Sequence, residues 1–223
     1  MTYSILARDP STGALGCATA TGTPVVGGFV LHAATGVGVV ATQGLSTSTL
    51  YGPQALARLA AGEDPEAVVA ALTQADAGRD ARQLAVMDAS GRADTFTGAD
   101  NLDECCVVAE PGLCVAANWV ATADLAERVA DAYRRAEGPL VLRLLAALEA
   151  GAAAGGDARG NRSAALRIVD PAAPAVDLRA DDDAPDPVAR LRAIHRATQE
   201  PGFQRFLAGV PTLADPWRRG FRP

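Results

Sequence analysis

Residues 2–8 read Thr-Tyr-Ser-Ile-Leu-Ala-Arg, and residues 14–20 read Ala-Leu-Gly-Cys-Ala-Thr-Ala. The residues between them, Asp9-Pro10-Ser11-Thr12-Gly13, are typical of a turn, so the two runs predict strands over Thr2–Arg8 and Ala14–Ala20. Two more strands are predicted over Phe29–Ala34 and Val37–Gln43. Because parallel neighbours need longer connections, the four strands are expected to form an antiparallel meander.

The rest of the chain predicts further blocks of helices and strands. Two helices are expected, from Pro53 to about Gly62 and, capped by Asp64, from Pro65 to about Asp76. The later predicted elements are strands at Gln83–Met87, Ala93–Thr97, Cys105–Ala109 and Leu113–Ala117, helices at Asp124–Arg135 and Leu140–Ala150, strands at Ala164–Val169 and Val176–Ala180, and a helix from Pro187 to about Thr198. Segregated blocks of this kind predict an α+β fold with two stacked, mostly antiparallel sheets and helices outside.

The 223 residues are enough for one large domain, although length alone also allows two small ones. We predict a single domain over residues 1–200. Residues 201–223 contain Pro201, Pro211, Pro216 and Pro223, so this segment is expected to be an irregular tail that lies over the domain.

Composition excludes several function classes. All twenty basic residues are arginine, which excludes a Schiff base, a pyridoxal attachment site, a P-loop lysine and a Ser–Lys dyad. The net charge of −6 argues against nucleic-acid binding, and the Arg-rich segment 217–222 is interpreted as a solvated or docked tail. Apolar runs are too short to span a membrane, and the first residues do not resemble a signal peptide, so a cytoplasmic location is expected.

The cysteines and histidines predict no metal site. Cys17, Cys105, Cys106 and Cys114 contain no CxxC pair, and His32 and His195 are the only histidines. We interpret the cysteines as reduced, small apolar residues on strands. No metal or organic cofactor is implied.

Thr2 is the first candidate catalytic residue. Aminopeptidases remove an initiator Met when the next residue is small, and a terminal Thr carries a hydroxyl nucleophile beside an α-amine with a pKa of about 8. The alternative is that Thr2 is an ordinary β-branched residue opening a strand. Local sequence alone favours this alternative.

Several stretches resemble an uncharacterised bacterial family known as domain of unknown function 1028. They are residues 2–10, 36–43, 51–53, 155–166 and 176–182, and the most specific is Gly155-Gly156-Asp157-Ala158-Arg159-Gly160. The resemblance runs in order over roughly residues 2–196. It implies an αββα sandwich similar to that of N-terminal-nucleophile (Ntn) hydrolases, which agrees with the predicted element order, and it implies no known reaction.

The resemblance also implies candidate site residues, which are Thr2, Thr42, Gln43, Asn118, Asp157, Arg159 and Ser163. Asn118 or Gln43 can donate hydrogen bonds to a developing oxyanion. Arg159 can bind a substrate carboxylate while Asp157 orients the guanidinium. The alternative is that Asp157 and Arg159 form a salt bridge that only fixes the loop.

The chain departs from the family pattern at three places. A Ser-Lys-Phe stretch is replaced near Thr21-Gly22-Thr23, His32 stands near a family aromatic, and Ser48-Thr49-Leu50 replaces an Asn-Pro. Threonine hydrolases of the proteasome type use a lysine to tune the nucleophile, so here either the α-amine acts alone or the chain is not a hydrolase. His32 is a candidate surrogate base or a structural histidine. The polar run 46–49 can line a pocket or be a solvated loop.

Three hypotheses follow. The first is an amidohydrolase acting on a small amide or peptide-like bond, with Thr2 as nucleophile, Asn118 at the oxyanion and Arg159 selecting an anionic group. The second is a catalytically silent protein that binds a small ligand on the same fold. The third is a subunit of a homo-oligomer, with the aliphatic residues around Leu140–Leu148 at the interface, although these residues can equally pack on the sheets.

Overall fold

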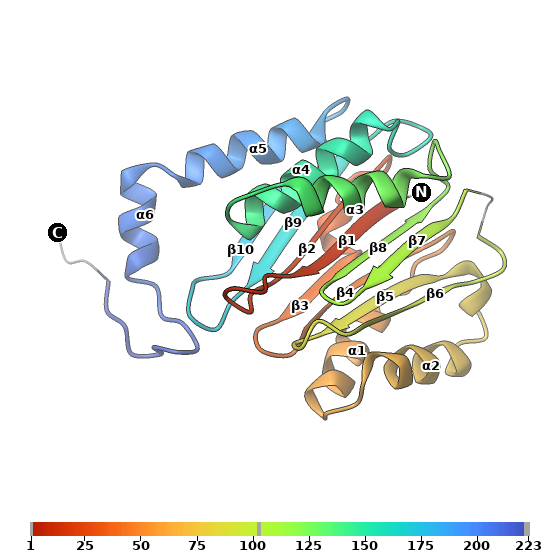
Figure 1. Ribbon diagram of the computed structural model, residues 1–223, viewed down its shortest axis with the longest axis horizontal. Coiled ribbons are helices and arrows are strands. Elements are labelled where there is room, and N and C mark those ends of the chain that lie inside the picture. The colour runs from red at the N-terminus through yellow and green to blue at the C-terminus, as the bar shows by residue number, and fades with distance from the viewer. Residues whose placement is uncertain (1, 102–103, 221–223) are drawn as a thin grey trace.

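The computed structural model describes residues 2–101 and 104–220. Figure 1 shows four layers: a helical layer, a six-stranded sheet, a four-stranded sheet and a second helical layer. The αββα sandwich predicted from the sequence is therefore confirmed.

The six-stranded sheet has the strand order β10–β9–β2–β1–β8–β7, and every neighbouring pair is antiparallel. Its strands are β1 (Thr2–Arg8), β2 (Leu15–Thr21), β7 (Cys106–Glu110), β8 (Leu113–Asn118), β9 (Ser163–Val169) and β10 (Val176–Ala180). The first strand of the chain thus lies in the middle of the sheet, between β2 and β8.

The four-stranded sheet has the antiparallel order β3–β4–β5–β6. Its strands are β3 (Leu31–Ala34), β4 (Gly38–Gln43), β5 (Gln83–Asp88) and β6 (Ala93–Thr97). The strands β4 and β5 are buried along their whole length, because one face meets the other sheet and the other face meets helices.

Helices cover the outer faces of both sheets (Figure 1). The helices are α1 (Tyr51–Ala60), α2 (Pro65–Ala75), α3 (Leu125–Arg135), α4 (Leu140–Ala153), α5 (Pro187–Thr198) and α6 (Pro201–Ala208), with short 3₁₀ turns at η1 (Val26–Gly28) and η2 (Arg79–Ala81). Helices α1 and α2 pack on the four-stranded sheet, α3 and α4 pack on the six-stranded sheet, and α5 packs on β9 and β10. Asp64 caps α2 as predicted, because its carboxylate accepts the Ala67 N–H at 2.9 Å.

Three apolar layers alternate with the sheets. In β1, Ile5 packs under α3 and α4, whereas Leu6 packs against the four-stranded sheet, as the two-residue period of a strand requires. The aliphatic face of α4, including Leu144 and Leu148, is buried in the first of these layers. Those residues therefore pack on the sheet, which is the second of the two alternatives drawn from the sequence.

The expected four-strand meander is wrong. Strand β2 is followed by residues 22–30, which include η1 and carry the chain from one sheet to the other, so β3 pairs with β4 in the second sheet. The remaining edge of β2 is taken by β9. Short spacing predicts antiparallel pairing within β1–β2 and β3–β4, but it does not specify the sheet to which each hairpin belongs.

The expectation of an irregular tail is also wrong over Pro201–Ala208, which form α6. Pro201 stands at the first helical turn, where its missing N–H costs no hydrogen bond. Helix α6 buries none of its own residues and extends beyond the sandwich as an arm (Figure 1).

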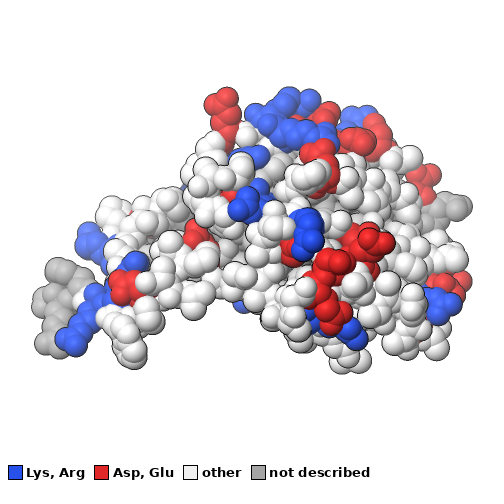
Figure 2. Space-filling view, turned by 60° about the horizontal axis from the view of Figure 1, so that its bottom comes forward, with Lys and Arg blue, Asp and Glu red and all other residues white. Residues whose placement is uncertain are grey.

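Surface arginines are mostly paired with carboxylates. Examples are Arg58 with Glu63 at 2.8 Å and Arg92 with Asp88 at 2.7 Å. On the face in Figure 2, basic and acidic side chains accordingly occur together in small groups. Over the described residues, no helix has the length and apolar character needed to cross a membrane.

Candidate active site

A row of polar side chains crosses four neighbouring strands at one end of the six-stranded sheet. Thr2 pairs with Thr21 of β2 on one side and with Asn118 of β8 on the other, and Thr21 pairs in turn with Ser163 of β9. Paired residues share a face of a sheet. Leu6, on the same face of β1 as Thr2, packs against the four-stranded sheet, so the whole row faces the space between the sheets.

Both the side chain and the backbone carbonyl of Thr2 are hydrogen-bonded. Its hydroxyl donates to Thr21 Oγ1 at 3.2 Å, and its carbonyl accepts from Gln43 Nε2 at 3.2 Å. The residue is 6% exposed. The side chain is therefore buried but still reaches the cavity described below.

Two glutamines of the four-stranded sheet reach across to this row. Gln43 and Gln83 are register partners on β4 and β5, and Gln43 Nε2 donates to Gln83 Oε1 at 2.6 Å. Gln43 Oε1 accepts from Ser4 at 2.6 Å, and Asn118 Nδ2 donates to Gln83 Oε1 at 2.9 Å. Buried amides need such partners, since an unsatisfied one costs about 1–3 kcal/mol.

The amide orientation of Gln83 follows from its fixed neighbours. Gln83 Nε2 lies 3.0 Å from the Ala117 carbonyl, which can only accept a hydrogen bond, so the nitrogen must face it. Gln83 Oε1 must then accept, and Asn118 must present Nδ2 to it. One hydrogen of the Asn118 amide is used in this way, and the other makes no hydrogen bond within the described residues, whereas Asn118 itself lines the cavity described below.

Asp157 and Arg159 form the second half of the site. The buried Asp157 carboxylate accepts from Gly22 N at 2.5 Å and from Arg159 N at 2.9 Å. Arg159 Nε and Nη2 bind the same carboxylate at 3.1 and 3.0 Å. The loop-fixing salt bridge therefore exists, and its guanidinium also lines the cavity, so the two alternatives drawn from the sequence are compatible.

A cavity of about 460 Å³ joins these residues. Its polar lining includes Thr2, Thr21, Gln43, Asn118 and Arg159. The volume lies within the roughly 300–1,000 Å³ that is usual for small-molecule sites. Four of the eight predicted site residues thus border one cavity, and a fifth, Asp157, binds Arg159 of this lining.

Over residues 2–191, the chain matches the model of a family of unknown function, DUF1028. The chain belongs to the DUF1028 family. The resemblance described from the sequence is therefore confirmed. None of the curated proteins compared with the chain matches it.

The crystal structure of the DUF1028 protein SPO2555 from Silicibacter pomeroyi is similar over 99% of both chains, with 35% identity and a TM-score of 0.94. HslV from Trypanosoma brucei shares 11% identity at a TM-score of 0.48, over 75% of this chain and 99% of that one. Anbu, an ancestral β-subunit from Yersinia bercovieri, shares 13% identity at a TM-score of 0.41, over 95% of this chain and 99% of that one. Likeness at the level of the last two does not bear on the activity or assembly of the DUF1028 chain.

Three of the predicted site residues lie apart from the cavity. His32 and Thr42 are on the outer face of β3 and β4: His32 abuts Gly52 of α1, and Thr42 Oγ1 contacts Thr47 Oγ1 at 3.1 Å. Burial lowers the pKa of His32, and its Nε2 is buried with no hydrogen-bond partner among the described residues. Ser163 extends the polar row, but its hydroxyl donates to Thr23 O at 2.6 Å and accepts from Val26 N at 3.1 Å, so it holds the cavity wall.

Sequence reasoning missed Gln83, Thr21 and Trp119. Gln83 begins the predicted strand Gln83–Met87, and a polar residue at a strand terminus is the signal that the sequence offers for it. Trp119 follows Asn118, has a φ of 49° and lies with its ring centroid 5.5 Å from the Arg159 guanidinium carbon. The polar run 46–49 contributes one lining residue, Thr47.

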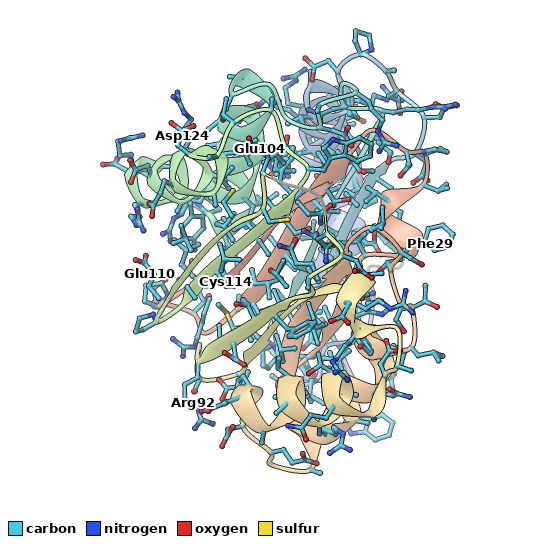
Figure 3. All side chains as sticks on the ribbon, turned by 90° about the vertical axis from the view of Figure 1, so that its right-hand side faces the viewer. Phe29, Arg92, Glu104, Glu110, Cys114 and Asp124 are labelled. Atoms are coloured by element: carbon cyan, nitrogen blue, oxygen red, sulfur yellow. The ribbon has the colours of Figure 1, made fainter. Side chains whose placement is uncertain are left out.

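The buried cysteines are poor nucleophiles. Burial raises the pKa of both Cys17 and Cys114 to about 12, so their thiols stay protonated at neutral pH. Both lie between the sheets, and Figure 3 marks Cys114. Among residues 2–101 and 104–220, no group of three or more His, Cys, Asp or Glu side chains has the arrangement of a metal site.

Proposed function

We propose that the chain is an amidohydrolase in which Thr2, after removal of Met1, is the N-terminal nucleophile. The observation that carries the proposal is the place of Thr2: it starts the central strand, borders the cavity, and lies in register with Thr21 and Asn118. A hydroxyl and an α-amine on the same residue supply nucleophile and base together.

The reaction would have two stages. The neutral α-amine takes the proton from Thr2 Oγ1 while Oγ1 bonds to the amide carbonyl carbon, which forms a tetrahedral oxyanion. The C–N bond then breaks, the leaving amine takes the proton, and the acyl group remains as an ester on Oγ1. Water adds to this ester with the α-amine again accepting a proton, and the carboxylic acid leaves as Oγ1 is reprotonated.

Asn118 would donate to the oxyanion. Because Gln83 accepts one hydrogen of Nδ2, the second is directed away from Gln83 and is held by a buried network that does not need to reorganise. Arg159 would bind an anionic group of the substrate with the part of its guanidinium that Asp157 does not use.

A small-ligand-binding protein is the second candidate function. It is favoured by the surroundings of the Thr2 hydroxyl, whose hydrogen-bond partner in the described chain is Thr21, a residue that cannot act as a base at neutral pH. Catalysis would then depend wholly on the α-amine. A blocked N-terminus would abolish an enzyme of this kind and would leave a binding protein unaffected.

The decisive experiment is intact-mass analysis of untagged protein, followed by a hydrolysis screen with amide substrates. We expect a chain that starts at Thr2 with a free amine, and loss of turnover in Thr2→Ala but not in Thr35→Ala, which lies in the turn between β3 and β4. Thr2→Ser should keep part of the activity because it retains the hydroxyl. Retained Met1, or equal turnover by Thr2→Ala, would contradict the mechanism and favour ligand binding.

A further inference from the structure

Exposed apolar side chains surround the mouth of the Thr2 cavity. Val25, Phe29 and Leu45 are 43%, 49% and 56% exposed and line the same cavity, as does Trp119 at 39%. Phe29 projects from the segment before β3 toward solvent (Figure 3). Single exposed apolar residues are ordinary on protein surfaces, but four around one cavity are typical of a site for an apolar ligand group.

The apolar wall is held in place at a conformational cost. Val25 has a φ of 55°, which is rare for a β-branched residue, and Trp119 has a φ of 49°. The Val25 backbone is anchored on both sides, because its N–H donates to Asp181 O at 2.8 Å and its carbonyl accepts from Gly28 N at 3.1 Å. Strained residues that the surroundings hold firmly cluster at ligand sites.

The polar side of the cavity favours an anion. Arg159 is the single charged side chain among the described residues that line the cavity. Asp157 occupies Nε and Nη2 of Arg159, and Nη1 makes no hydrogen bond within the described chain. The Asp157 carboxylate also accepts hydrogen bonds from Gly22 N and Arg159 N. Its negative charge is therefore stabilised by these backbone N–H groups as well as by the Arg159 guanidinium. A ligand carboxylate can therefore bind the remaining edge of the guanidinium.

The geometry points to a definite substrate class for the proposed Thr2 hydrolase: an amide that joins an apolar acyl group to an amine carrying a carboxylate, as in an N-acylated amino acid. The inference rests on the proposed function. The apolar wall takes the acyl chain, Thr2 and Asn118 meet the amide, and Arg159 binds the carboxylate. Hydrolysis would release an apolar carboxylic acid and a free amino acid.

Binding can be measured apart from catalysis by using the full chain with Thr2→Ala. The probes for titration calorimetry are N-hexanoylalanine, the primary amide of N-hexanoylalanine, and N-acetylalanine. The second probe lacks the carboxylate, and the third lacks most of the apolar chain. We expect each to bind about tenfold or more weakly than N-hexanoylalanine, which corresponds to the loss of one specific interaction.

Two further substitutions in this background assign each preference to its residue. Arg159→Met should lower the affinity for N-hexanoylalanine to that for its primary amide, and it should leave the affinity for the primary amide unchanged. Phe29→Ser should reduce the ratio of the affinity for N-hexanoylalanine to the affinity for N-acetylalanine. The matched controls are Arg162→Met, whose arginine pairs with Asp182 on the surface, and Phe206→Ser on α6, and neither should change any affinity.

The outcomes separate the substrate class from the reaction. Equal affinity for the three probes, or no binding at millimolar concentrations, would overturn the proposed class. Selective binding without hydrolysis by wild-type protein with a free Thr2 would support the ligand class and contradict the Thr2 mechanism. Hydrolysis of other amides without these preferences would support the mechanism and contradict the class.

Discussion

Asn118 Nδ2 donates to Gln83 Oε1 at 2.9 Å, and this bond joins the end of β8 in one sheet to the start of β5 in the other. Gln83 Nε2 also donates to Thr97 Oγ1 and to the Ala117 carbonyl, each at 3.0 Å. One fully buried glutamine thus orients the amide that the proposed mechanism places at the oxyanion.

Gln83→Met should destabilise the protein strongly. The change nearly preserves volume but removes the buried hydrogen bonds of Gln83 to the Ala117 carbonyl and to the Asn118 amide, so the free energy of unfolding should fall by about 2–4 kcal/mol. Urea denaturation measures this change. Gln54→Met on the exposed face of α1 is the control, and an equally small effect of both variants would show that the network contributes little.

Gly22→Ala should disturb the Asp157–Arg159 pair. A Cβ at Gly22 would lie 2.8 Å from all three atoms of the Asp157 carboxylate, which accepts the Gly22 N–H. We expect a loss of roughly 1–3 kcal/mol in the free energy of unfolding. Gly28→Ala is the matched control, because a Cβ there meets no atom of the described residues within 4 Å, and it should change stability by less than about 0.5 kcal/mol. A larger loss of stability in Gly28→Ala than in Gly22→Ala would be incompatible with this packing.

Protonation of His32 should make the stability of the fold depend on pH, but it should not affect ligand binding in the cavity. Burial, assisted by the charge of Arg167, lowers its pKa in the folded state, so the unfolded chain binds this proton first as the pH falls. The contribution of His32 to stability is present above about pH 6.5 and is lost as the pH falls through its lower folded pKa. His32→Gln should therefore lose less stability than wild type between pH 7.5 and pH 5.5.

Urea denaturation at the two pH values is the measurement for His32. His195→Gln is the comparison, because burial also lowers the pKa of His195, and the double variant should show the smallest loss. The pH profile of ligand binding should stay the same in His32→Gln, since His32 lies on the outer face of the sheet against α1. A shifted binding profile would mean that protonation of His32 changes the affinity of the cavity for its ligand.

Cys17 and Cys114 should resist alkylation in the folded protein. Both are completely buried with a pKa of about 12, so neither the accessible surface nor the thiolate that iodoacetamide requires is present. Peptide mapping by mass spectrometry should find both unmodified in buffer and modified in urea. Rapid modification of the native protein would indicate that the two sheets separate readily.

Much of the secondary structure is predictable from local signals. The strands Thr2–Arg8, Ala93–Thr97 and Val176–Ala180 have the predicted bounds, as does the helix Pro187–Thr198. Turn residues and caps mark these ends, and their effect extends over only a few neighbouring residues. The second strand partner of β2 was not predictable in this way, because the pairing of β2 with β9 joins segments far apart in the chain.

The candidate site was predictable only in part. The resemblance named Thr2, Gln43, Asn118, Asp157 and Arg159, and the structure brings these residues together. It also named Thr42 beside Gln43, yet adjacent residues in a strand point to opposite faces, and the two side chains are separated by the sheet. The position of Gln83 at the start of a strand is a weak local signal, because its role arises from contacts with Gln43 and Asn118.

The sequence by itself determined the class of fold, most strands and helices, and the absence of lysine chemistry, because hydrophobic periodicity, turn residues and composition are local properties. Only the tertiary structure decided which hairpin joins which sheet, which side of β4 faces Thr2, and which apolar side chains border the cavity. Those features depend on register and on packing between distant segments, where a shift of one residue moves a side chain to the other face of a sheet.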